Sequence, residues 1–177
     1  MNASDLTTSL QAAVTTYFAG ERNEGVLIIA GSVLAAALAA WLWAATRSSF
    51  AVSFGATVVL SSALLAATAG SLLVRDKPLA ANLLQGIAST ERTTVTAAEH
   101  ERVGVILSKY RYYRYGAVIL ATIGILGLLL SDRAWVHGIS AGLLLLVVAQ
   151  ILIDHYSEQR ARIYHEHLSA SSVSPHI

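Results

Sequence analysis

The sequence predicts an all-α, polytopic membrane protein with four transmembrane helices. Of its 177 residues, 55% are apolar and only 13% are charged, a balance that a soluble domain of this length does not show. Four runs contain no charged residue, and these are residues 25–46, 48–74, 115–131 and 134–153. A helix needs about 20 apolar residues to cross the hydrocarbon layer of a bilayer, so each run is a candidate span.

The composition of these runs favours helices over the strands of a barrel. Every backbone amide in lipid has to be paired within its own helix or within a closed barrel. Barrel strands alternate in polarity, whereas "VLIIAGSVLAAALAAWLW" and "GLLLLVVAQILI" show no alternation and are rich in Leu and Ala. A bundle of helices is therefore expected.

Residues 1–24 are expected to form an amphipathic segment at the membrane surface. Helical spacing places Leu6, Leu10, Val14, Tyr17 and Phe18 on one face. We expect this face to lie on the inner leaflet, and a frayed tail is the alternative. The segment is long and acidic, unlike a secretory signal, so the first span is expected to be retained. Residues 25–74 then form the first transmembrane hairpin.

Residues 75–96 are expected to be a connection with one short helix. Pro78 suits a first helical position, and "STERTT" interrupts the pattern after it. Thr96 and Glu99 have capping-box spacing, which predicts a new helix start. Residues 97–168 then form a hairpin of two long helices that contain spans three and four, followed by a flexible tail at 169–177.

Both helices of this second hairpin are longer than a bilayer requires. Each exceeds the hydrocarbon by about 20 Å at 1.5 Å per residue. Because the link "SDRA" is short, the third and fourth helices are expected to extend into the cytoplasm as an antiparallel pair.

The distribution of basic residues predicts the orientation. Ten of the 12 Lys and Arg residues lie in the two tails and in segment 75–114, and only Arg47 and Arg133 lie in the two short hairpin links. Cytoplasmic loops carry the excess of basic residues. We therefore expect a multi-pass membrane protein with both termini in the cytoplasm.

Charged residues after the last span fit two interpretations. In the first, they form structural ion pairs across the antiparallel helices, Arg114 with Asp154, and Lys109 and Arg111 with Glu158. In the second, carboxylate and imidazole groups bind a transition metal, and the candidates are His100, Glu158, His165 and His167. The helical spacing of these residues is not specific for metal, so no cofactor is predicted.

Small residues in the spans predict close helix packing. Gly138 and Gly142 form a GxxxG pair, and Ser62, Ala66 and Gly70 form a stripe on the second span. These contacts join helices of one chain or of two chains, and a homo-oligomer is one of the expected partners alongside the lipid bilayer.

The sequence resembles a group of small bacterial inner-membrane proteins with four helices and no assigned activity. The resemblance rests on "HERVGVILSKYRYYRYG" before the third span and "DHYSEQRARIYHEHL" after the fourth. It implies a fold and a bacterial origin, and it brings no catalytic residues.

No catalytic constellation is present in the sequence, so we expect a protein that is not an enzyme. The first hypothesis is a structural or partner-docking helical bundle, oligomeric, that binds a cytoplasmic or membrane protein. The alternative is a passive channel or small-solute carrier between subunits, with His137 and Ser140 near the pore. A metal-responsive protein is the further alternative. A net charge of +1 argues against nucleic acid as a partner.

Overall fold

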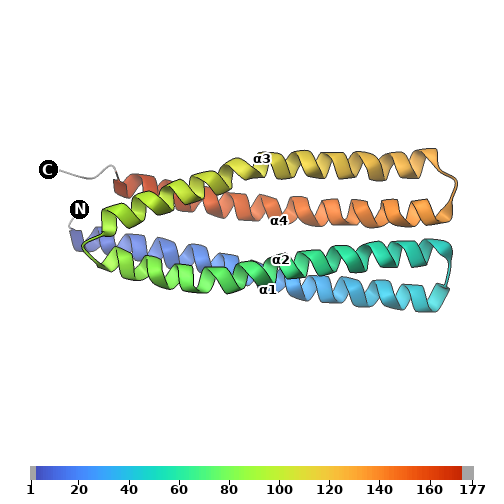
Figure 1. The fold of residues 1–177 in the computed structure, drawn as a ribbon, viewed down its shortest axis with the longest axis horizontal. Helices are drawn as coiled ribbons and strands as arrows, with labels where there is room; N and C mark the ends of the chain where they lie inside the picture. Colours follow the sequence, from blue (N-terminus) through green and yellow to red (C-terminus); the bar gives the residue numbers. More distant parts are fainter. Residues whose placement is uncertain (1–2, 173–177) are drawn as a thin grey trace. The chain divides into compact units, whose positions relative to one another are not determined.

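The protein consists of four long helices, described here by a computed structural model for residues 3–172 (Figure 1). The helices are α1 (Ala3–Thr46), α2 (Ser49–Ala88), α3 (Arg92–Leu130) and α4 (Ala134–Ser172). The described residues contain no strand. All four helices are long and apolar enough to cross a membrane, which confirms the all-α class with four long apolar helices and supports a multi-pass membrane protein.

Each helix end coincides with a local signal in the sequence. Arg47 has a positive φ of 50° and donates its amide to the Trp43 carbonyl, the left-handed geometry that commonly ends a helix. Ser48 then accepts a hydrogen bond from the amide of Ala51 and caps α2. Ser89 and Ser131 accept amide hydrogen bonds in the other two links.

Helix boundaries in the first half of the chain differ from those expected. No helix ends at the boundary expected after residue 24, because α1 continues from Ala3 to Thr46. Pro78 does not begin a new helix and lies inside α2. A proline inside a helix costs about 3 kcal/mol, and the packing of Leu79, Leu83 and Ile87 in a core offsets this cost.

Boundaries in the second half are also shifted. The connection between α2 and α3 is only residues 89–91, and α3 begins at Arg92, four residues before the capping box at Thr96. The last helix continues to Ser172, through part of the expected tail. Residues 173–177 of that tail lie outside the described residues.

The chain divides into two compact units. Unit 1 contains Met1–Asn23, Leu72–Tyr110 and His155–Ile177, and unit 2 contains Glu24–Ser71 and Arg111–Asp154. Each unit therefore includes a part of every helix.

Unit 1 has an apolar core to which all four helices contribute. Its buried members are Leu10, Val14, Tyr17, Leu83, Ile87, Val103, Ala161, Tyr164 and Leu168. The apolar face that we expected to lie on lipid thus packs on protein. The physical reason is that α2, α3 and α4 offer this face a dry core, which removes the same apolar area from water.

Unit 2 is held together by close contacts at glycine. A Cβ at Gly55 would lie 3.2 Å from the Ala39 carbonyl oxygen of α1, and one at Gly124 would lie 3.0 Å from Leu144 of α4. Gly138 and Gly142 face α2, where a Cβ would meet Phe50, Ser53 and Phe54 or Thr57. The GxxxG pair therefore packs α4 against α2 within one chain.

Other small residues have different surroundings. Ser62 is buried in unit 2 and Ala66 is half-buried. No atom lies within 4 Å of a Cβ built at Gly31, Gly70 or Gly116. Of the stripe on the second span, only Ser62 and Ala66 are therefore packed against other parts of the protein, whereas a side chain at Gly70 would have no close contact.

We predict that Gly138→Ala destabilises the protein by about 1 to 3 kcal/mol, because the added methyl meets the backbone of α2, as overpacking does elsewhere. Thermal unfolding in detergent, followed by helical circular dichroism, measures the change. Gly31→Ala is the matched control. The control should be neutral or stabilising, since Ala favours a helix by about 1 kcal/mol over Gly. Equal melting temperatures for the two variants would contradict the close α2–α4 contact.

Candidate functional site

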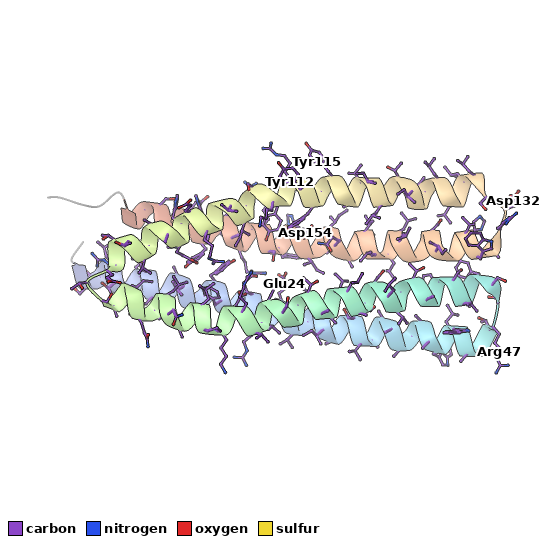
Figure 2. All side chains as sticks on the ribbon, viewed as in Figure 1. Glu24, Arg47, Tyr112, Tyr115, Asp132 and Asp154 are labelled. Atoms are coloured by element: carbon purple, nitrogen blue, oxygen red, sulfur yellow. The ribbon has the colours of Figure 1, made fainter. Side chains whose placement is uncertain are left out.

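The charged residues of unit 2 lie only at its two ends. Arg47 and Asp132 lie at one end, and Glu24 and Asp154 lie at the other (Figure 2). Between the ends the helices carry only uncharged side chains. At about 1.5 Å per residue the uncharged run of α4 is about 30 Å long, which equals the thickness of the hydrocarbon core.

Polar groups inside unit 2 bond within the chain. Ser140, which we expected near a pore, is buried and its hydroxyl lies against Gly127. His137 Nε2 forms a hydrogen bond with the Ser131 carbonyl. No buried side-chain nitrogen or oxygen of the described residues lacks a partner. These contacts give both residues a role in the packing of one chain.

Unit 1 contains a buried carboxylate at the centre of a polar network. Glu99 is 3% exposed. Arg102 donates to both of its oxygens at 2.7 Å, and the Tyr164 hydroxyl donates to it at 3.2 Å. A buried charge has to be paired and hydrogen-bonded in this way, because desolvation disfavours it.

Two tyrosine rings lie beside this network. Tyr17 of α1 and Tyr164 of α4 are stacked with their centroids 4.4 Å apart. Burial raises the pKa of both phenols, and nearby carboxylates raise it further, Glu21 for Tyr17 and Glu99 for Tyr164. Both phenols therefore stay protonated, and the Tyr164 hydroxyl keeps the proton that it donates to Glu99. Burial by itself would lower the pKa of Arg102, but the hydrogen bond and charge of Glu99 raise it.

This network was not predicted from the sequence. Glu99 and Arg102 have the i,i+3 spacing of helical ion pairs, and that spacing was an available signal. The third member, Tyr164, is 65 positions away in sequence. Only the packing of α4 on α3 in unit 1 brings it to Glu99.

The expected ion pairs between the middle of α3 and the middle of α4 stay predictions. Asp154 accepts a hydrogen bond from Gln150 at 2.8 Å. Glu158 is largely buried and forms a 2.6 Å salt bridge with Arg162 of the same helix. Lys109 and Arg111 are exposed.

The metal candidates are distributed over separate contacts. His100 and His165 stack with centroids 4.0 Å apart, and His100 Nε2 bonds to Ser169 at 2.9 Å. His167 Nδ1 bonds to the Ile163 carbonyl, and Glu158 bonds to Arg162. Within residues 3–172 no group of three or more His, Cys, Asp or Glu side chains is arranged to hold a metal ion.

A groove of about 330 Å³ lies between α1 and α4 in unit 1. Its floor includes Ala13 and the Tyr17–Tyr164 stack, and Arg160 and His167 supply basic groups. Arg160 is held by Glu21 through a 3.1 Å salt bridge. It crosses α1 at Gly20, where a Cβ would lie 2.7 Å from the Arg160 Cδ.

We predict that Glu99→Ala destabilises the protein by about 2 to 4 kcal/mol, because Arg102 and Tyr164 lose their buried acceptor. Chemical unfolding in micelles measures the loss. Glu101→Ala is the control, since Glu101 is exposed on the same helix and exposed charges contribute about 1 kcal/mol or less. Similar losses for the two variants would show that Glu99 is not the centre of a buried network.

The stacked histidines predict a dependence of stability on pH. Desolvation and the neighbouring His100 lower the pKa of His165, against the opposing effect of Glu166. Because the unfolded chain then binds the proton more readily, stability is full above about pH 6.5 and falls as pH drops through that value.

The measurement is thermal unfolding at about pH 7.5 and about pH 5.5. Acidification should lower the melting temperature of the natural protein, and His165→Gln should reduce this dependence. His155→Gln, at an exposed histidine of the same helix, should leave it unchanged. An unaltered pH dependence in His165→Gln would contradict the prediction.

Comparison of the chain with protein-family models, with curated proteins and with solved structures finds no match.

Proposed function

We propose that the protein is a non-enzymatic, four-span protein of a bacterial inner membrane and that its unit 1 docks a protein partner in the cytoplasm. The observation that carries the proposal is the separation of charge between the units. Unit 2 has its seven charged residues at its ends, whereas unit 1 carries the other 16 and has a core of its own. This separation is what a membrane span joined to a water-exposed module requires.

The excess of basic residues supports a cytoplasmic location for unit 1. Arg47 and Arg133 are the two bases at one end of unit 2, and the other ten lie at its opposite end or in unit 1. With this orientation the third and fourth helices extend into the cytoplasm as an antiparallel pair. Reporter fusions in the 89–91 link test it, and a periplasmic reporter would overturn the proposal.

The groove in unit 1 supports docking as the role of this module. Its wall includes Ile163, whose side chain is 50% exposed. Arg160, which forms a salt bridge with Glu21, and His167 supply its basic groups, and no carboxylate is among the lining residues. An apolar floor with basic edges fits an amphipathic segment that carries acidic residues.

Site-specific photo-crosslinking in intact cells tests this role. A photoreactive residue at Ile163 should give one discrete adduct. One at Val105, which is also 50% exposed and lies in unit 1 outside the groove, should give none. His167→Glu should reduce the Ile163 adduct, because its charge repels an acidic partner.

The mass of the adduct identifies the occupant. An adduct of twice the 18.7 kDa chain would identify a second copy and replace the docking proposal with self-association. Equal adducts from Ile163 and Val105 would show that the groove is not the docking surface.

A channel is the competing function, and vesicle flux separates the two. Purified protein in sealed vesicles should release neither ions nor small solutes if the proposal is correct. Release that depends on Ser140 would establish the channel instead.

A further inference from the structure

Residues 111–116 of α3 form a segment that is exposed on every side. All six are exposed, although Tyr110 before them and Ala117 after them are buried. Six residues make more than one and a half helical turns, so they cover the whole circumference. No other stretch inside a described helix shows six successive exposed residues. A large part of each of these residues is therefore accessible from outside the protein.

The segment combines tyrosines with arginines. Tyr112, Tyr113 and Tyr115 are 69%, 47% and 60% exposed, and Arg111 and Arg114 are also exposed. Tyr112 and Tyr115 point away from the other helices of unit 2 (Figure 2). Tyrosine places an apolar ring and a polar hydroxyl at a membrane surface.

The charge of α3 in this region has one sign. No Asp or Glu occurs on α3 after Glu101. Arg111 and Arg114 are three positions apart and therefore lie on the same side of the helix. A guanidinium group binds phosphate oxygens through two parallel hydrogen bonds. The ligand that complements this segment is an anion with phosphate chemistry.

The position of the segment indicates that the phosphate belongs to a lipid headgroup. Tyr115 begins the uncharged run that ends at Ser131, so the segment lies where hydrocarbon gives way to headgroups. At the opposite end of unit 2 the exposed aromatic residues are Trp41, Trp43, Phe50 and Trp135, and none is a tyrosine. The tyrosines of unit 2 thus gather at one end only, whereas arginines lie at both ends.

We propose that residues 111–116 bind the headgroups of anionic phospholipids, with Arg111 and Arg114 on the phosphates and the tyrosines at the glycerol level. The interaction is independent of what the groove in unit 1 docks. It would give the protein a preference for membranes rich in acidic lipid.

The test compares lipid binding by the full-length protein in detergent. Phosphatidylglycerol and phosphatidylcholine are added separately, and bound lipid is counted by native mass spectrometry. The natural protein should bind phosphatidylglycerol roughly tenfold more tightly. The double variant Arg111→Gln/Arg114→Gln should lose most of this preference. Its circular dichroism spectrum should match that of the natural protein, which excludes misfolding as the cause.

Two further variants make the result specific. Arg111→Lys/Arg114→Lys should restore part of the preference, because the charge is kept and the forked donor is lost. Arg47→Gln/Arg133→Gln removes two arginines at the opposite end of unit 2 and should leave the preference unchanged.

Three outcomes would overturn the proposal. The first is equal binding of the two lipids by the natural protein, and the second is an equal loss in the Arg47 and Arg133 variant. The third is competition by inorganic phosphate at millimolar concentration, which would identify a free anion as the ligand and not a lipid headgroup.

Discussion

The exclusion of charge from hydrocarbon is the constraint on which the rest of the structure depends. A charged side chain at the centre of a bilayer costs about 3 kcal/mol on insertion scales, and unit 2 carries none between its ends. Its helices therefore associate without ion pairs. Contacts at Gly55, Gly124, Gly138 and Gly142 let backbones approach closely instead.

Unit 1 differs from unit 2, because it buries charged side chains together with apolar ones. Leu10, Val14 and Val103 form part of a dry core, and Glu99 is buried beside it with Arg102 and Tyr164 as partners. A buried pair of this kind adds little net stability, but it selects one arrangement of the helices, since any other leaves the charge unpaired. Such selectivity suits a module whose surface has to keep one shape.

Much of the fold could be predicted from the sequence, and the reasons are physical. The uncharged runs predict the membrane spans, and the GxxxG pair predicts a surface where helices pack closely. The expectation for residues 1–24 was wrong in its location, because an amphipathic face has the same pattern whether it lies on lipid or on protein. The helix start expected at Pro78 was likewise predicted from local propensity. The packing of Leu79 and Leu83 outweighs that propensity, so that α2 continues through the proline.

The candidate site was less accessible to sequence reasoning. Glu99 and Tyr164 meet only through tertiary packing, and the exposure of Tyr112 around α3 depends on which neighbours are absent. The histidines were read as metal candidates, although His100 and His165 are stacked rings. The sequence shows which chemical groups each residue carries. Which partners those groups contact is decided by tertiary packing.

The core of unit 1 joins α1 to α4, which are separated in the chain by two long helices. Val14 of α1 and Leu168 of α4 are both fully buried in it, so this core cannot close until synthesis has passed α4. A nascent chain that has not yet reached α4 therefore exposes the apolar face of α1. Chaperones and proteases recognise such surfaces, and the cell thus has a means of distinguishing chains in which this core has closed from those in which it has not.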